Sequence, residues 1–196
     1  MDFRKTFDKI PEDFDKYRPR YCGELFEELT RKCELGPNKK VLEIGPGTGQ
    51  ATEPILKTGC DYTAIELGEN FTAFMQEKFA SYSNFHIINA DFEKHDFEKD
   101  AYDLVYSAAT IQWIPEQIAF SKTYDMLKPG GYLAMFMTRA DENSLNQELR
   151  GEIDQVYQKY FHVKQQYTCQ MHYENVTDYG FTNYTYQEWK KQRELD

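Results

Sequence analysis

The chain has 196 residues, a length typical of one domain of ordinary size or of one domain with a short appendage. Hydrophobic residues make up 40% of it and charged residues 29%, which is enough apolar material for a sizeable core and excludes a disordered chain. The formal net charge is −10. A negative body does not attract nucleic acid or an anionic membrane surface, so we expect neither as the main partner.

The expected location is the cytoplasm. No run of about 18 or more apolar residues, the length that spans a bilayer, occurs, and the first five residues lead into polar sequence rather than a signal-peptide core. The four cysteines are widely spaced and form no CxxC pair, which argues against a zinc site or a disulfide framework. They are Cys22, Cys33, Cys60 and Cys169.

Up to about Thr138 the chain alternates short apolar segments with amphipathic ones. In chain order, this pattern predicts a helix around 24–29, a strand at 40–44, a helix through 55–56, a strand at 62–66, a helix at 70–81, strands at 85–89 and 102–107, a helix at 115–127, a tight turn at 128–131 and a strand at 132–137. Such an alternation is typical of an α/β, Rossmann-like, doubly wound sheet that is mostly parallel, with helices on both faces.

The pattern changes after Thr138. A helix is predicted at 144–160, followed by a region rich in Gln, Asn and Tyr with a strand at 182–187. The aromatic side chains of this tail either form a core face there or line a substrate pocket. We divide the chain into an N-terminal lead and helix (1–34), a Rossmann-like core (35–140) and a C-terminal helix and strand (141–196).

The most informative unit is the glycine-rich turn between the first strand and the next helix. Gly45, Gly47 and Gly49 alternate there, two residues after the acid Glu43. Glycines let the backbone adopt positive φ and let a ligand approach, and the helix N-terminus adds free N–H groups. Dinucleotides and S-adenosylmethionine both use this geometry, but a dinucleotide motif needs glycine where Gln50 stands. A tight turn without a ligand is the structural alternative.

Two further strand ends carry candidate ligand-binding residues. Glu66 ends the second strand, and a carboxylate there can accept hydrogen bonds from both ribose hydroxyls, although a solvated acid is the simpler alternative. After the third strand, Asp91 could accept from an exocyclic amine, and Phe92 offers apolar surface to a purine. Ligands of open α/β sheets bind at the carboxyl ends of the strands, so we expect these groups to converge.

Five segments together resemble the class I S-adenosylmethionine-dependent methyltransferases, most closely their small-molecule branch. The segments are 41–50, 64–66, 89–92, 102–105 and 127–131. The resemblance covers about 7–138. It implies S-adenosyl-L-methionine as the cofactor, S-adenosyl-L-homocysteine as the product and a small molecule as the methyl acceptor.

The resemblance also implies which residues bind the cofactor. The lead segment 7–21 would cap it, with Tyr17 and Arg18 near the methionine end, where a guanidinium would suit a carboxylate. The segment 107–114 would lie beneath the transferring methyl group, and Gln112 would hydrogen-bond the adenine or the substrate. Packing in the core is the alternative for Trp113. The whole set comprises Tyr17, Arg18, Glu43, Gly45, Pro46, Gly47, Thr48, Gly49, Gln50, Glu66, Leu67, Asp91, Phe92, Ser107, Ala108, Gln112 and Trp113.

The catalytic residue is left unassigned. Methyl transfer from a sulfonium needs mainly alignment of the reactants and exclusion of water, and a carboxylate nucleophile needs no base. His86 is predicted to be packed within a strand, His95 lies in an acidic loop, and His162 and His172 fall in the tail. None has a partner that the sequence identifies.

Several other functions lose support. Segment 107–110 reads Ser-Ala-Ala-Thr where methyltransferases of nucleic-acid amino groups carry an Asn/Asp-Pro-Pro-Tyr/Phe tetrad. No phosphate-binding G-x-x-x-x-G-K-[ST] motif occurs, and no metal-ligand spacing, so no metal is expected. The remaining alternatives are a cofactor-binding protein without turnover and, disfavoured by Gln50, a nicotinamide-dependent oxidoreductase.

The resemblance implies two strands after the fifth, the last of them antiparallel. Segment 182–187 is the candidate for the first of these, and no candidate for the second follows it. We therefore expect a sheet that lacks its last strand and a truncated acceptor side. An unpaired sheet edge favours association, so a homodimer through that edge is also expected.

Overall fold

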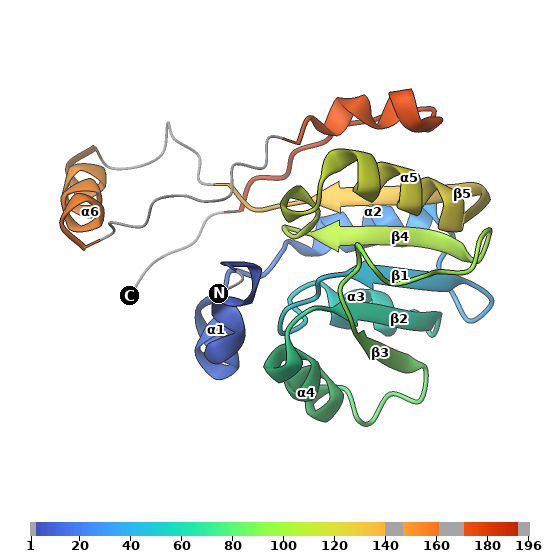
Figure 1. Cartoon of the computed structure of the whole chain (residues 1–196), viewed down its shortest axis with the longest axis horizontal. Coiled ribbons are helices and arrows are strands. Elements are labelled where there is room, and N and C mark those ends of the chain that lie inside the picture. Colours follow the sequence, from blue (N-terminus) through green and yellow to red (C-terminus); the bar gives the residue numbers. More distant parts are fainter. Residues whose placement is uncertain (1–2, 140–146, 161–170, 192–196) are drawn as a thin grey trace.

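The computed structural model of the chain describes residues 3–139, 147–160 and 171–191. Its centre is a parallel five-stranded sheet in the order β3-β2-β1-β4-β5 (Figure 1). The strands are β1 (Lys40–Ile44), β2 (Asp61–Glu66), β3 (Phe85–Asn89), β4 (Tyr102–Ala108) and β5 (Leu127–Phe136). The α-helices are α1 (Pro11–Tyr17), α2 (Gly23–Lys32), α3 (Thr52–Leu56), α4 (Glu69–Lys78), α5 (Glu116–Met126) and α6 (Gln147–Tyr160). The short 3₁₀ helices are η1 (Phe3–Lys5), η2 (Phe7–Lys9), η3 (Ile111–Trp113) and η4 (Tyr173–Tyr179).

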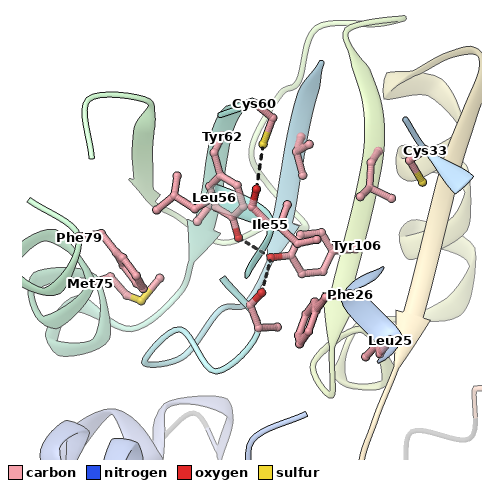
Figure 2. Close-up of a cluster of buried hydrophobic side chains, with 14 residues drawn as sticks. Leu25, Phe26, Cys33, Ile55, Leu56, Cys60, Tyr62, Met75, Phe79 and Tyr106 are labelled. Atoms are coloured by element: carbon pink, nitrogen blue, oxygen red, sulfur yellow. Dashed lines mark hydrogen bonds between the residues drawn. The ribbon is translucent and has the colours of Figure 1, made fainter. Parts of the chain in front are cut away.

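The central strands are buried on both faces, which explains their nearly continuous apolar sequence. In β1, Val41 contributes to one hydrophobic cluster and Leu42 to another. The first cluster packs against α2, α3 and α4, and Figure 2 shows it. The second packs against α5 and η4. The sheet therefore has a core on each side, and its carboxyl edge is left to loops.

The α/β, Rossmann-like fold is confirmed. The five predicted strands occur, and the helices predicted at 24–29, 55–56, 70–81 and 115–127 correspond to α2, α3, α4 and α5 with small shifts at their ends. The helix predicted at 144–160 corresponds to α6, and residues 144–146 lie outside the described residues.

The tight turn predicted at 128–131 is wrong, because these residues lie within β5. Tyr102 of β4 pairs with Leu127, whereas Leu104 pairs with Tyr132, so the segment bulges out of the ladder. Gly130 has φ +79°, and a Cβ on Gly131 would lie 2.9 Å from the carbonyl oxygen of Lys128. The glycines are thus required by a bulge rather than by a turn between elements.

The strand predicted at 182–187 is also wrong. These residues are exposed, form no ladder, and include Asn183 at φ +58°, which interrupts an extended run. The aromatic residues before them cover α5 instead: Tyr179 packs on Phe120 and Phe181 on Tyr124, at ring-centroid distances of 5.3 Å each. In the described part of the chain the sheet has five strands, and β5 forms one of its edges.

His86 is exposed, contrary to the expectation of a packed imidazole. Its side chain is 62% exposed and lies 3.9 Å from the Asp61 carboxylate. The reason is topological: β3 is the other edge strand, so its alternate side chains meet solvent.

Cys22, Cys33 and Cys60 are free thiols. No helix within the described ranges has the length and apolar character needed to cross a bilayer.

The N-terminal lead is fastened to the core through Asp8 of η2. Its carboxylate is buried and accepts a hydrogen bond from the Phe71 N–H at 2.8 Å, in the first turn of α4. The residue at the N-cap position of α4 is Gly68, which has no side chain to do this. A Cβ there would lie 2.2 Å from Asp8 Oδ1. Asp8 thus caps a helix whose bonded N–H lies 63 residues further along the chain.

Replacing Asp8 by alanine is expected to lower the free energy of unfolding by about 1 kcal/mol, because the capping bond is lost from a buried helix end. Urea denaturation measures this. Asp13→Ala, an exposed position in the first turn of α1, is the matched control and should change stability little. Equal stabilities of the two variants would show that the lead is not held by this cap.

Candidate functional site

The glycine turn joins β1 to α3 at the centre of the sheet, beside the point where the strand order reverses between β1 and β4. Gly45, Gly47 and Gly49 have φ of +64°, +59° and +83°. A Cβ on Gly45 would lie 2.2 Å from Thr110, and one on Gly49 would lie 2.7 Å from Phe79. Those two glycines are required by the protein's own packing, whereas a Cβ on Gly47 would meet the Phe14 ring of the lead at 3.2 Å and Gln50 Oε1 at 3.7 Å.

Glu66, at the end of β2, bridges the two loops that leave the central strands. One carboxylate oxygen accepts the Gly47 N–H at 3.0 Å, and the other accepts the Gly68 N–H at 2.8 Å. The residue is only 7% exposed. Burial raises the pKa of Glu66 to about 7, and the nearby Asp8 carboxylate acts in the same direction. The carboxyl group is thus poised between its two protonation states near neutral pH.

The lead crosses over this turn. The Phe14 ring lies between those of Phe7 and Phe71, with centroids 5.5 and 5.1 Å away. Lys78 of α4 reaches both the Asp15 carboxylate of α1 and the Thr48 carbonyl oxygen of the turn, each at 2.8 Å. The N-terminal segment therefore covers the turn with aromatic surface and is tied to it by a shared lysine.

The loop after β3 is held from two sides. Arg4 of η1 pairs with Glu93 at 2.7 Å and with Asp91 at 3.3 Å. Lys122 of α5 donates from Nζ to the carbonyl oxygens of Phe92, Glu93 and His95 at 2.9, 3.0 and 2.7 Å. The Phe92 side chain is buried in the α5-side core, and its ring packs on Phe97. Asp91 thus lies just beyond the carboxyl end of β3, while the Phe92 side chain points into the core.

The loop after β4 closes the other side of the turn. The buried Ser107 hydroxyl donates to the Ile44 carbonyl oxygen at 3.1 Å and accepts the Ile111 N–H at 3.0 Å. Thr110 Oγ1 donates to the Gly45 carbonyl oxygen at 2.8 Å. Gln112 Nε2 donates to the Ala109 carbonyl oxygen at 2.9 Å. The Oε1 of Gln112 is buried and has no hydrogen-bond partner among the described residues.

Glu43 lies beneath the turn rather than at its surface. It is fully buried and accepts a hydrogen bond from Thr52 Oγ1 at 2.5 Å and another from the Tyr62 hydroxyl. The Tyr62 hydroxyl also bonds to that of Tyr106, whose oxygen lies 3.4 Å from the Ala51 carbonyl oxygen (Figure 2). Burial raises the pKa of Glu43. This polar cluster fixes the start of α3 against β2 and β4, and so positions the turn above it.

The other predicted site residues lie in varied surroundings. Tyr17 is 62% exposed, and the Arg18 guanidinium lies over the Phe14 ring, 5.5 Å from its centroid. Gln50 Nε2 donates to Thr48 Oγ1 at 2.6 Å. Pro46 is buried, and Leu67, Ala108 and Trp113 are half-buried. The cofactor-binding role of the whole set stays a prediction.

Several residues at this edge escaped the sequence interpretation: Asp8, Phe14, Lys78, Thr110 and Lys122. Each acts on a segment between 30 and 65 positions away in the chain. No local motif marks such contacts. Within the described ranges, no group of three or more His, Cys, Asp or Glu side chains gathers in a way that could hold a metal ion.

A parallel sheet with a glycine turn at its switch point and an acid ending the next strand defines a nucleoside-binding α/β domain. Comparison with known proteins specifies the class. A family model described as "Methyltransferase domain" matches residues 42–135. A malonyl-[acyl-carrier protein] O-methyltransferase from Marinomonas sp. is 32% identical over 133 residues, covering 66% of this chain and 48% of the relative. A ribosomal RNA small subunit methyltransferase A from Hahella chejuensis is 37% identical over 73 residues, covering 37% and 27%.

A solved structure shows the same fold. The CcbJ methyltransferase from Streptomyces caelestis superposes with a TM-score of 0.56 at 21% identity, over 67% of this chain and 57% of that one. Residues 42–135, a little under half of the chain, are thus similar to a methyltransferase domain, and the fold is that of a class I S-adenosylmethionine-dependent methyltransferase. The chain spans about half the length of the Marinomonas relative, 48%.

The raised pKa of Glu66 makes stability depend on pH. The folded protein binds this proton more tightly than the unfolded chain, so protonation of Glu66 stabilises the folded state. This stabilisation is complete below about pH 4.5 and is lost as pH rises through about 7. The free energy of unfolding of the ligand-free protein, relative to Glu66→Gln, is expected to fall on the order of 3 kcal/mol across that window. Urea titrations of both proteins at several pH values measure this. Parallel pH profiles would contradict the assignment.

Proposed function

We propose that this chain binds S-adenosyl-L-methionine at the carboxyl edge of its sheet and transfers the methyl group to a small-molecule acceptor, releasing S-adenosyl-L-homocysteine. The observation that carries the proposal is the Gly47 N–H held against Glu66, with a side-chain-free position directly beside a buried carboxylate. The family match supports the same cofactor. The division into lead (1–34), core (35–140) and tail (141–196) is part of this proposal.

The residues fit such a cofactor. A carboxylate oxygen accepts more than one hydrogen bond, so Glu66 can take ribose hydroxyls in addition to its two backbone donors. Gln112 Oε1, buried and without a partner in the described part of the chain, is an acceptor that an N–H or O–H of a ligand would satisfy. A buried unsatisfied acceptor is costly, so this oxygen favours a bound donor.

The chain's own residues align and shield rather than react. The bound cofactor would supply an activated methyl group on a sulfonium. Glu66 would fix the sugar, Gln112 would orient a donor group, and Phe14 of the lead would exclude water from above the turn. Glu43 would act indirectly, by holding α3 and the turn in place. This division of labour needs no general base if the acceptor is a carboxylate.

The acceptor is proposed from chemistry and charge. The Marinomonas relative is named an O-methyltransferase of a malonyl carrier protein, which makes carboxylates the first class to test. The net charge of −10 disfavours nucleic acid, although an RNA methyltransferase is also among the relatives. A cofactor-binding protein without turnover is the alternative, since the chain lacks the strands that follow β5 within its described residues.

A cytoplasmic location and a homodimer through the sheet edge complete the proposal. The outer edge of β5 pairs with no strand in the part of the chain that the structure describes, and an open edge favours association. A solution mass corresponding to a stable monomer at high concentration would remove the homodimer from it.

Binding is tested first. S-adenosyl-L-homocysteine is expected to raise the melting temperature and NAD to leave it unchanged. Gly47→Val should abolish the shift, because a branched side chain would strain a residue at φ +59° and place its Cβ 3.2 Å from the Phe14 ring, which distorts the turn held by Glu66. Gly36→Val, where an added Cβ meets nothing within 4 Å, is the matched control.

A graded variant tests the ribose contact itself. Glu66→Gln should weaken binding by about 1–3 kcal/mol, the scale of a hydrogen bond to a charged group, as measured by titration calorimetry above pH 8. Unchanged affinity would exclude Glu66 from contact with the ligand, even if the Gly47 variant behaves as expected.

Turnover is tested separately. S-adenosyl-L-homocysteine should form from S-adenosyl-L-methionine in the presence of one member of a panel of carboxylates, phenols and amines, and the Gly47→Val protein should form none. Tight binding without product across the panel would favour the alternative, a cofactor-binding protein without turnover.

A further inference from the structure

The loop that follows β3, residues 91–95, is contacted by two cations from different parts of the fold. Arg4 of the lead pairs with the carboxylates of Asp91 and Glu93. Lys122 of α5 binds the main chain instead: its Nζ donates to the carbonyl oxygens of three loop residues, at 2.7 to 3.0 Å. Because α5 packs in the core, the contacts of Lys122 persist when the lead moves.

The surroundings of Lys122 do not require an ammonium group for packing. The residue is half-buried, and its Nζ lies 5.5 Å from the centroid of the Phe92 ring and 5.9 Å from that of Phe97. Its charge pairs with no carboxylate among the residues that the structure describes. A half-buried charge is costly unless its donors are satisfied, and three carbonyl oxygens satisfy the three N–H groups of an ammonium. The charge is therefore required by the loop rather than by the core.

The loop conformation that Lys122 holds also fixes the Asp91 side chain. The Asp91 carbonyl oxygen accepts the N–H groups of Lys94 and His95 at 3.0 and 2.9 Å, and its Oδ1 accepts the Glu93 N–H at 3.1 Å. These bonds need a chain that turns back on itself after residue 91. The carbonyl groups bound by Lys122 belong to the same turn, so the Asp91 carboxylate has a defined position relative to α5.

The beginning of the loop is anchored to Glu66. The Ala90 N–H donates to the Glu66 carbonyl oxygen at 2.9 Å, and the Asn89 side-chain amide donates to the same oxygen at 3.0 Å. The spacing between the Glu66 and Asp91 carboxylates is thus set by this anchor and by Lys122. A nucleoside held by its sugar at Glu66 carries its base at a distance that its covalent structure fixes. That spacing therefore decides whether Asp91 reaches the base.

We propose that Lys122 is a positioning residue for base recognition: by holding the loop 91–95, it places the Asp91 carboxylate against an exocyclic amino group of the bound base. A carboxylate accepts such a donor, and a base without the amino group leaves the acceptor unpaired. The inference rests on the proposed function, because it requires a nucleoside at Glu66. Lys122 itself touches no ligand and acts through the loop, so its loss should change selectivity between bases rather than remove binding.

Calorimetric affinities for two ligands test this role: S-adenosyl-L-homocysteine and its analogue with hydrogen in place of the exocyclic amino group. The wild-type protein should bind the first at least about tenfold more tightly, the scale of a hydrogen bond to a charged group. In Lys122→Met, which keeps the apolar packing, the ratio should fall to about threefold or less, and affinity for the analogue should change little. Lys122→Arg keeps the charge and several N–H donors, and should recover most of the ratio.

Lys99→Met is the matched control. It makes the same substitution at a 73%-exposed lysine that pairs with Asp125 rather than with the loop, and should leave the ratio unchanged. A second measurement needs no ligand. The amide protons of Lys94 and His95 should exchange with solvent about tenfold faster in Lys122→Met than in the control, because their bonds to the Asp91 carbonyl oxygen open with the loop.

The outcomes distinguish the role of Lys122 from the proposed function. A wild-type protein that does not bind S-adenosyl-L-homocysteine would overturn both. Binding with the same ratio in the wild type and in Lys122→Met would overturn the role of Lys122 alone. Equal losses of affinity for the two ligands would do the same, since that is the result of a purely structural contact. Unchanged amide exchange would show that Lys122 does not hold the loop, and would also overturn the role.

Discussion

The architecture of the candidate site depends on one buried carboxylate. Glu66 accepts the N–H of Gly47 from one loop and the N–H of Gly68 from the next, so the loops that follow β1 and β2 are joined through a single side chain. Because Gly68 is the N-cap residue of α4 and Asp8 caps the same helix, the N-terminal lead is connected to this arrangement. An acid that would be costly to bury alone is stabilised by backbone donors, and it organises three segments at once.

A second buried acid supports the first from below. Glu43 has no access to solvent, and its hydroxyl partners come from α3 and β2, with Tyr106 of β4 linked through Tyr62. Both hydroxyls donate to the same carboxylate oxygen, Oε2, whereas the buried Oε1 has no hydrogen-bond partner among the described residues. The turn is thus held from beneath by polar contacts, from one side by Thr110, and from above by Phe14. Its shape is set before any ligand arrives.

The sequence predicted what depends on local pattern and failed where distant segments decide. Apolar runs such as Val41-Leu42 indicate strands buried on both faces, and the alternating glycines indicate the turn that follows the first strand. The fold and the turn were therefore predictable. The bulge at 128–131 was not, because whether a Pro-Gly-Gly segment ends a strand or interrupts one depends on its pairing with β4. The strand at 182–187 failed because alternation alone does not provide a neighbour to pair with. Phe92 was expected to face a ligand, yet it is buried in the α5-side core, and its partner Lys122 on α5 lies too far along the chain for a motif to reveal it.

The fastening of the lead has a kinetic consequence. Arg4, Asp8 and Asp15 attach it at the ends of β3, β2 and β1 respectively, through Glu93, Phe71 and Lys78. If a nucleoside binds at the 7%-exposed Glu66 as proposed, the Phe14 ring beside Gly47 would have to move with the lead, and the three attachments lie close enough along the chain to open together. Local opening of this kind is a sub-global fluctuation whose free energy is set by the contacts broken. On the proposed function, entry and departure of the ligand would then follow the rate of that fluctuation rather than the rate of diffusional encounter.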